Sequence, residues 1–464
     1  MLLNKGEPGE GWDLTLWKKI GLLVLIFLGV IGIYGLLVTQ SSKIYPGVRL
    51  DTIGLGGLTK EEAYKKLEEN LEDRLKKDLV LVYQDKEFTT NLRDLGYSYD
   101  LEGMVEEAYG IGHKASFGEN FVAALQVYFQ GPLALEGSFE KGPMEDYLQG
   151  LGDRIDRTPQ NAEIILEGDQ VQVKKDRAGR FLDQKKTAKR IQAWSGEGEV
   201  ALPVYVKKAQ VQAQDLESID GVLGDFETKY GTSEKNRKFN IALGAEKLNN
   251  FLIQPGQEVS FNDRMDQITK EAGFKTSGVI KNGVFDRGVG GGICQVSTTL
   301  YNALVRADVE IIERHNHSRP IGYVKNGTDA AVATGHKNLV FKNPYKTPIY
   351  IKSSADGQTL GFQVFGSQAE KDYEVKMIPK LLGSQAPRTE KIYTDRLSQG
   401  DSQVVESGHR GYYYKTYIEK IRDGEVFERK EISTSSYPAG RRVVYVGTRT
   451  SSSNNDKEDK EDKE

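Results

Sequence analysis

The spacing of apolar residues changes along the chain, and each spacing predicts a different element. Residues 20–38 form an uncharged apolar run of 19 residues, close to the ~20 that a helix needs to cross a bilayer. Trp17, Lys18 and Lys19 precede it, as is typical of a cytoplasmic flank. No small-residue cleavage motif follows, so the pattern favours an uncleaved signal anchor over a cleaved signal peptide. We therefore expect a cytoplasmic tail at 1–19, a transmembrane helix at 20–38 and, in this single-pass cell-membrane protein, extracellular domains beyond it.

Residues 43–211 predict an α+β module built on a weak internal repeat. Residues 94–108 resemble residues 176–191, because each segment has a glycine, an extended stretch, an aspartate and then apolar positions at helical spacing. Asp100 and Asp183 are the expected helix caps, since an aspartate side chain accepts hydrogen bonds from the free N–H groups of a first turn. Each of the two segments also follows a predicted hairpin.

Residues 212–372 predict a second α+β domain, with one prominent helix beside a mostly antiparallel sheet. An Asn-Gly pair at 282–283, between apolar strand ends, predicts a tight hairpin that runs into a glycine-rich loop. Upstream of it, residues 245–252 predict a short helix. After the loop, apolar residues recur at helical spacing, at Val296, Leu300, Ala303, Leu304 and Ala307.

Residues 373–448 change to a period-two alternation that predicts a β-rich module. A hairpin is expected about the Asp-Gly pair at 423–424. Residues 449–464 are polar and then alternate lysine with acidic residues, so they offer no apolar side chain to bury. We expect this last segment to be a disordered charged tail.

Composition narrows the function classes. The net charge of −4 gives no basic surface for nucleic acid, and one cysteine allows no intramolecular disulfide. The chain has no P-loop, dinucleotide fingerprint, HExxH or GxSxG motif, so nucleotide, NAD and serine-hydrolase functions have no support. We expect no cofactor.

The lone cysteine, Cys294, lies where the glycine loop meets the predicted helix. Free N–H groups and the positive end of the helix dipole favour a thiolate there. His317 and Asp329 follow, in the order that cysteine acyltransferases use for nucleophile, base and orienting carboxylate. His315 is the alternative base, because both histidines share one face if this segment is a strand. The alternative for Cys294 is a small buried residue that closes a turn.

Other residues around Cys294 could bind a substrate. Gly291 and Gly292 let the backbone approach a substrate closely, and Gln295 adds a side-chain donor for an oxyanion. The polar face of the helix could contact a glycan or a peptide, or simply face solvent. The residues of that face are Ser297, Thr298 and Tyr301. Arg314 could contact the substrate or form a structural pair with Glu313. A zinc site formed by Cys294, His315, His317 and Asp329 is a further alternative, although its H-x-H spacing is common by chance.

Three motifs together resemble the VanW family. They are GGGICQVSTTLYNA, ERHNHSRP and the DAAV that begins at Asp329, and RKFNIALGAEKLNNFLIQPGQEVSFND is similar to the family's lead-in. The resemblance covers roughly residues 228–368. The family takes its name from glycopeptide-resistance gene clusters, and the resemblance implies no particular reaction. The family often has an acidic residue where Lys337 and Asn338 stand here, which leaves Asp329 as the candidate carboxylate.

The flanking segments resemble modules that accompany cell-wall proteins. Residues 43–211 look like the peptidoglycan-binding domain often found ahead of VanW domains, and the end of residues 373–448 is similar to a G-five domain. These resemblances imply a membrane-anchored envelope protein whose partner is peptidoglycan or another cell-wall polymer. One hypothesis is a cysteine-dependent amidase or acyltransferase that acts on cell-wall peptides. The other is a non-catalytic wall-binding or assembly protein in which Cys294 is structural.

Overall fold

The computed structural model describes residues 14–39, 41–113, 116–129, 131–168, 170–281 and 284–450. Most of the predicted tails at 1–19 and 449–464, and the Asn-Gly pair of the predicted hairpin, lie outside these residues. The chain divides into two compact units. Unit 1 comprises Met1–Pro159 and Ala178–Lys207, and unit 2 comprises Gln160–Arg177 and Lys208–Glu464.

The predicted membrane segment lies within helix α1 (Leu14–Thr39). Within the described part of the chain, however, no helix has both the length and the apolar character that a bilayer crossing requires. The prediction of an N-terminal transmembrane helix is therefore wrong, and the expected membrane contact through residues 20–38 falls with it. The uncharged run has 19 residues, and a length close to the ~20 of a span does not by itself establish one. Lys18 and Lys19 lie inside α1 rather than ahead of it.

Unit 1 combines short helices with small sheets around two apolar clusters. Helices α3 and α6 begin at the predicted caps, because Asp100 accepts a hydrogen bond from the Gly103 N–H (2.9 Å) and Asp183 accepts one from the Lys186 N–H (3.0 Å). The elements of unit 1 after α1 are β1 (Arg49–Leu50), β2 (Ile53–Gly54), α2 (Lys60–Lys76), β3 (Leu79–Tyr83), β4 (Lys86–Thr90), β5 (Tyr97–Tyr99), α3 (Leu101–Gly110), α4 (Phe117–Gln126), β6 (Gly137–Phe139), α5 (Pro143–Ile155), β9 (Gly179–Leu182), α6 (Gln184–Gln192), β10 (Val200–Ala201) and β11 (Val204–Lys207).

The hairpin of β7 (Glu163–Glu167) and β8 (Gln170–Lys174) belongs to unit 2, whereas β9 and α6 belong to unit 1. The two parts of the second predicted repeat therefore lie in different units. The hairpin packs on unit 2 through a buried cluster that includes Ile164, Tyr350 and Phe365.

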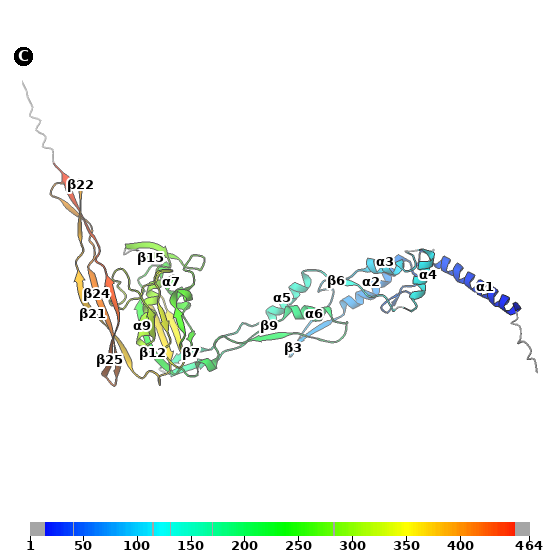
Figure 1. Ribbon diagram of the computed structural model, residues 1–464, viewed down its shortest axis with the longest axis horizontal. Coiled ribbons are helices and arrows are strands. Elements are labelled where there is room, and N and C mark those ends of the chain that lie inside the picture. Colours follow the sequence, from blue (N-terminus) through cyan, green and yellow to red (C-terminus); the bar gives the residue numbers. More distant parts are fainter. Residues whose placement is uncertain are drawn as a thin grey trace, which may run out of the picture. The chain divides into compact units, whose positions relative to one another are not determined.

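The main sheet of unit 2 is antiparallel, and α9 (Ile293–Arg306) packs against it (Figure 1). The predicted apolar stripe of this helix is confirmed, because all five of its residues are buried. Helix α7 (Lys235–Glu246) contacts both α9 and the sheet. The sheet strands, in spatial order, are β12 (Gly221–Lys229), β20 (Thr359–Gly366), β19 (Ile349–Ala355) and β13 (Phe251–Ile253).

Smaller elements surround this layer. The prediction of a helix at 245–252 was wrong in its limits, because α7 ends at Glu246 and β13 begins at Phe251. The predicted hairpin is confirmed as β15 paired with β16 in antiparallel register. The smaller elements are η1 (Ala213–Leu216), β14 (Glu258–Ser260), α8 (Phe261–Met265), β15 (Thr276–Lys281), β16 (Val284–Val289), β17 (Glu310–Glu313) and β18 (Val340–Lys342).

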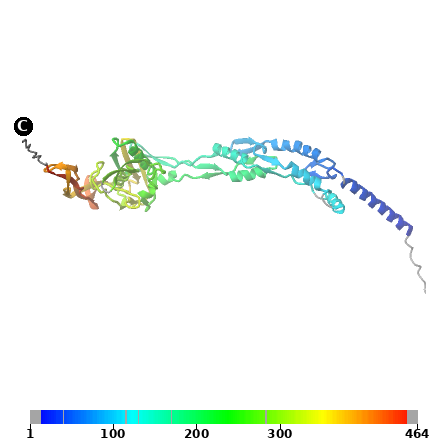
Figure 2. The same ribbon diagram turned by 90° about the horizontal axis from the view of Figure 1, so that it is seen from above.

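The C-terminal part of unit 2 is β-rich, as predicted, and forms two three-stranded sheets. Figure 2 shows its strands in orange and red beside the green and yellow part of the same unit. The predicted hairpin turns at Asp423 and Gly424, both of which have positive φ angles. The strands are β21 (Glu374–Gln385), β22 (Thr389–Ser398), β23 (Ser402–Glu406), β24 (Gly411–Arg422), β25 (Glu425–Tyr437) and β26 (Arg442–Arg449).

Candidate functional site

The glycine loop brings Cys294 into the first turn of α9. Gly292 caps this helix with a φ of 114°, a conformation that side chains rarely adopt. A Cβ on Gly291 would lie 2.3 Å from Ser277 Oγ and 2.4 Å from the Gly278 carbonyl oxygen, so only glycine fits against β15. Cys294 itself remains half-buried. The loop is therefore shaped by close packing as well as by turn geometry.

Two buried polar residues hold the glycine loop. Asn240 of α7 donates hydrogen bonds to the carbonyl oxygens of Gly291 (3.0 Å) and Lys275 (2.8 Å), and its own side-chain oxygen accepts from the Lys275 N–H. The Ser277 hydroxyl also donates to the Gly291 carbonyl, at 2.9 Å. Sequence reasoning missed Asn240 because it placed the helix too late. If the helix had been placed correctly, a polar residue on its buried face would have indicated the role of Asn240.

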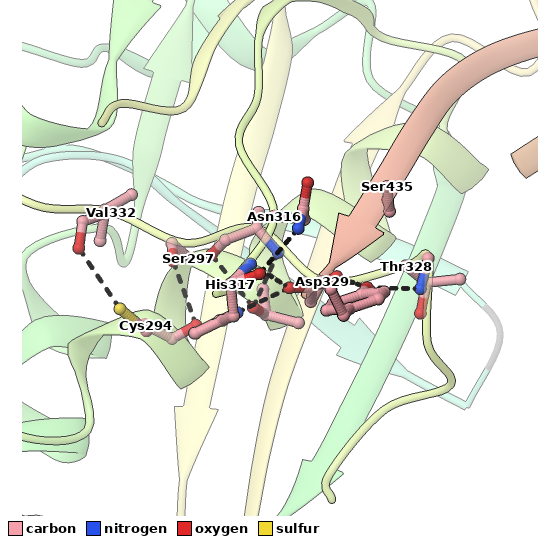
Figure 3. A network of polar contacts seen from close by, with 12 residues as sticks. Cys294, Ser297, Asn316, His317, Thr328, Asp329, Val332 and Ser435 are labelled. Atoms are coloured by element: carbon pink, nitrogen blue, oxygen red, sulfur yellow. Dashed lines mark hydrogen bonds and ion pairs between the residues drawn. The ribbon is translucent and has the colours of Figure 1, made fainter. Parts of the chain in front are cut away.

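Cys294, His317 and Asp329 interact in series, and Figure 3 shows His317 hydrogen-bonded to Asp329 and the Cys294 thiol directed to Val332. His317 Nδ1 lies 2.7 Å from Asp329 Oδ2, and the His317 backbone N–H donates to the same oxygen at 2.7 Å. Since Asp329 occupies Nδ1, the other ring nitrogen, Nε2, is left for the hydrogen bond with Cys294. The Cys294 Sγ atom also lies 3.4 Å from the carbonyl oxygen of Val332.

The electrostatics of these three residues favour an ion pair between thiolate and imidazolium. Burial raises the pKa of the Cys294 thiol, but the hydrogen bond with His317 and the positive charges of His317 and Arg237 outweigh it and bring that pKa below its usual value. Burial lowers the pKa of His317, but its hydrogen bonds with Asp329 and Cys294 prevail and raise it to about 9. The two shifts act in the same direction, toward a thiolate paired with an imidazolium.

Asp329 is fully buried and accepts two hydrogen bonds on each carboxylate oxygen. Its second oxygen, Oδ1, receives Arg314 Nη2 at 3.1 Å and the hydroxyl of Tyr437, the last residue of β25. Burial raises the pKa of Asp329, but the hydrogen bond with His317 and the charge of Arg314 outweigh this effect and hold that pKa below its usual value. Asp329 therefore stays ionised and orients His317.

The C-terminal strands hold the segment that carries Asp329. The Gly327 backbone N–H donates to the Tyr437 hydroxyl at 2.7 Å, and the Thr416 hydroxyl donates to the Gly327 carbonyl oxygen at 2.8 Å. Arg314 Nη1 donates to the Ser435 hydroxyl, also at 2.8 Å. Sequence reasoning missed Tyr437, Thr416 and Ser435, because the alternating pattern of this region only predicted a separate module.

A cavity of about 580 Å³ opens beside Cys294 and His317. Its walls come from the hairpin, the glycine loop and residues 320–323 and 332–334, and Arg237 of α7 also lines it. Tyr323 faces the same cavity, and burial keeps its pKa well above the usual value, so it remains a neutral hydroxyl. The cavity gives a ligand access to the thiol.

Of the other predicted site residues, Gly291 and Gly292 line the cavity. The remaining ones do not: they are Gln295, Ser297, Thr298, Tyr301, Arg314 and His315. The His315 Nε2 atom lies 2.8 Å from Glu313 Oε1, and β17 ends before this histidine, so the shared strand face does not form. The Arg314 side chain is buried, and its guanidinium pairs with Asp329 and donates a hydrogen bond to Ser435. It therefore holds the carboxylate, where a substrate contact was expected.

The predicted polar face of α9 lies inside the protein. Ser297 and Thr298 are fully buried and bind the Ala330 backbone, and Tyr301 is 1% exposed. The Gln295 amide nitrogen donates to Thr228 Oγ1 (3.0 Å) and to the Lys229 carbonyl oxygen (3.1 Å), so it does not point to an oxyanion. These positions looked exposed because the helix was expected to have one buried face, whereas it is covered on several sides.

The described residues contain no group of three or more His, Cys, Asp or Glu side chains arranged to hold a metal ion. The four residues of the alternative zinc site have hydrogen-bond or ion-pair partners in the protein instead. Asp329 is saturated by donors, and His315 pairs with Glu313.

Three family profiles match the chain in series. They are described as "Putative peptidoglycan binding domain" over residues 88–201, "VanW like protein" over residues 236–365 and "G5 domain" over residues 384–449. Two solved structures match the last segment. The crystal structure of HP0197-G5 is 21% identical and covers 16% of this chain and 97% of its own, with a TM-score of 0.13. The IgA1 protease G5 domain is 20% identical and covers 17% and 93%, with a TM-score of 0.14.

Two curated proteins are similar over longer stretches. "Uncharacterized protein YoaR" of Bacillus subtilis is 32% identical over 248 residues, which is 51% of this chain and 80% of that protein. "Vancomycin B-type resistance protein VanW" of Enterococcus faecalis is 29% identical over 140 residues, which is 29% of this chain and 51% of that protein. With the central profile match and a relative covered over most of its length, the chain belongs to the VanW family.

Proposed function

We propose that this protein is a cysteine-dependent enzyme that cleaves or transfers peptide amide bonds of the cell wall. The observation that carries the proposal is that Cys294 and His317 line one cavity while His317 is hydrogen-bonded to the buried Asp329. An activated cysteine with an oriented histidine is the arrangement that nucleophilic acyl transfer requires.

In the first step, the Cys294 thiolate attacks the carbonyl carbon of the amide and forms a C–S bond. The imidazolium of His317 donates its Nε2 proton to the leaving nitrogen as the C–N bond breaks. An acyl thioester on Cys294 and a free amine result. In the second step, neutral His317 takes a proton from water or from an incoming amine, which attacks the thioester and restores the thiolate.

Two features support catalysis at Cys294. The backbone N–H of Cys294, in the first turn of α9, can stabilise the negative oxygen of the tetrahedral intermediate, whereas those of Ile293 and Gln295 already donate to Gly290 and Gly292. Asp329 keeps the His317 ring in the orientation that aims Nε2 at the sulfur, and its own ionised state balances the imidazolium charge.

The matched domains support a cell-wall polymer as the partner and an envelope location for the protein. In this proposal the module at 43–211 binds peptidoglycan, the domain at 212–372 holds the reaction site, and the module at 373–448 adds a second wall contact. The relatives' own names do not describe a reaction, so the substrate class comes from the domain matches and from the chemistry of Cys294.

The test uses the full chain with soluble peptidoglycan fragments that carry stem peptides and cross-bridges. Acid quenching followed by intact mass measurement should detect an acyl adduct on the wild-type chain, and none on a Cys294→Ala variant. His317→Ala should slow product formation, whereas His315→Ala is the matched control and should not.

Fragments that bind equally to wild type and to Cys294→Ala, without any adduct or product, would contradict catalysis. That result would favour the non-catalytic wall-binding function, in which Cys294 is structural.

A further inference from the structure

The cavity beside Cys294 is positively charged. Arg237 and His317 are its basic side chains, and none of the described residues that line it is acidic. Most of the remaining wall is apolar, including Ile268, Val279 and Ile321. Charges act more strongly against such low-dielectric walls than on an open surface, so the cavity favours an anion.

Arg237 has no carboxylate partner within the described part of the chain. Its Nη2 donates to Gln295 Oε1 at 2.8 Å, and this amide is neutral, so no carboxylate of the described residues compensates the guanidinium charge. A guanidinium offers five N–H donors in a planar fork that matches a carboxylate. Arg237 is also close enough to Cys294 for its charge to lower the thiol pKa.

Residues 332–338 contribute to the walls of both the cavity and a second pocket, and the lining of the second pocket has the opposite charge. This neighbouring pocket shares Thr334 with the cavity. Its acidic lining residues, Asp263, Asp266 and Glu313, outnumber its basic ones, His336 and Lys337. A carboxylate would be repelled there and attracted beside Cys294. The two pockets therefore give a charged peptide a preferred side.

We propose that Arg237 binds a carboxylate of the acyl donor, so that the site takes anionic peptides whose free carboxylate lies close to the scissile amide. This inference rests on the proposed function, because it takes Cys294 as the nucleophile. Arg237 is then a residue that determines specificity, and an amidated peptide of the same sequence is a poor substrate.

The test compares alkylation of Cys294 by iodoacetate and by iodoacetamide, reagents that differ only in a carboxylate and an amide. Cys294 is the sole cysteine, so labelling of the full chain reports one thiol. The ratio of the two rates at pH 7 is divided by the same ratio for a cysteine peptide. We expect a preference for iodoacetate of about tenfold, within the range of electrostatic steering.

Three variants test whether Arg237 causes the preference for iodoacetate. Arg237→Gln should remove most of it, and Arg237→Lys should keep part of it because the charge remains. Lys235→Gln is the matched control, since Lys235 is exposed on the same helix and does not line the cavity. It should leave the ratio unchanged.

Each result is decisive. Equal ratios in wild type and Arg237→Gln, with both chains folded by circular dichroism and labelled at measurable rates, would overturn the role of Arg237. No labelling by either reagent in any variant would overturn the proposed function first, because the thiol would then be inaccessible. The inference would fall with it.

Discussion

The two ends of the series Cys294, His317 and Asp329 differ in exposure and in what surrounds them. At the cysteine end, the thiol is half-buried and faces a cavity made from the hairpin and the glycine loop. At the carboxylate end, Asp329 is fully buried and both of its oxygens are saturated by donors, one of which is the Tyr437 hydroxyl. His317 lies between these environments.

The difference teaches that reactivity and stability are separated along this series. Changes at Cys294 should alter chemistry with little effect on folding, because the residue is half-buried and borders a cavity. Changes at Asp329 should alter folding first, because its partner Arg314 is a buried charge. Variants at each end can therefore test whether reactivity and stability are separated.

The largest effect is expected from Asp329→Ala. This change leaves the Arg314 charge buried without its partner, which costs about 3–5 kcal/mol of folding free energy. Calorimetry of the full chain should detect a lower transition temperature for unit 2. Tryptophan fluorescence is the internal control, because all three tryptophans belong to unit 1, including Trp194.

A matched variant tests the other end. Cys294→Ser should change the same transition by less than about 1 kcal/mol, since the site is partly exposed. Equal losses for the two variants would refute the separation of stability from reactivity.

Tyr437→Phe should give the next largest effect. It removes one donor to Asp329 and leaves the Gly327 N–H without its acceptor, which costs about 1–3 kcal/mol for buried groups. The unit 2 transition should fall, while the alkylation rate of Cys294 at pH 7 should change less than it does in His317→Ala. A variant as stable as wild type would show that the C-terminal strands do not support the site.

His317→Ala should mainly affect reactivity. Without the imidazolium, burial dominates and the pKa of Cys294 rises, so fewer thiolates exist at any pH below that value. The alkylation profile should shift to higher pH, and the rate at pH 7 should fall about tenfold for each unit of pKa. His315→Ala should leave the profile in place. An unshifted profile in His317→Ala would mean that His317 does not activate the thiol.

The smallest effect is expected from Ser435→Ala. Arg314 loses one of its hydrogen bonds but keeps Asp329, so the loss should be about 0.5–1.5 kcal/mol in the unit 2 transition. Cys294 alkylation should be unchanged. A loss as large as that of Asp329→Ala would mean that the contact between Arg314 and Ser435 stabilises the buried cluster as much as the carboxylate does.

Local patterns predicted the parts of the site that depend on local structure. The stripe of apolar residues predicted α9, and the glycine loop predicted that Cys294 lies at its start. Both features depend only on residues that are close together in the sequence, within about one helix length. The order of Cys294, His317 and Asp329 suggested residues that the structure brings together in series. Their catalytic role stays a prediction.

Other parts could not be predicted because they depend on contacts far apart in the sequence. Tyr437 reaches Asp329 across 108 positions, and no periodicity encodes such a contact. Arg237 was missed for a local reason, since the apolar spacing of α7 is weak and the helix was placed after its true start. The transmembrane prediction failed because an apolar run alone does not define a span of sufficient length.

The hydrogen bonds between the C-terminal strands and Gly327 have a practical consequence for experiments on fragments of the protein. A fragment that ends at residue 372 would contain Cys294, His317 and Asp329, and would look complete by sequence. It would nevertheless lack the hydroxyls of Thr416 and Tyr437 that fix the Gly327 backbone. Truncation at that boundary is therefore a poor way to isolate the proposed reaction site, and the absence of a reaction in such a fragment would say nothing about the three residues it retains.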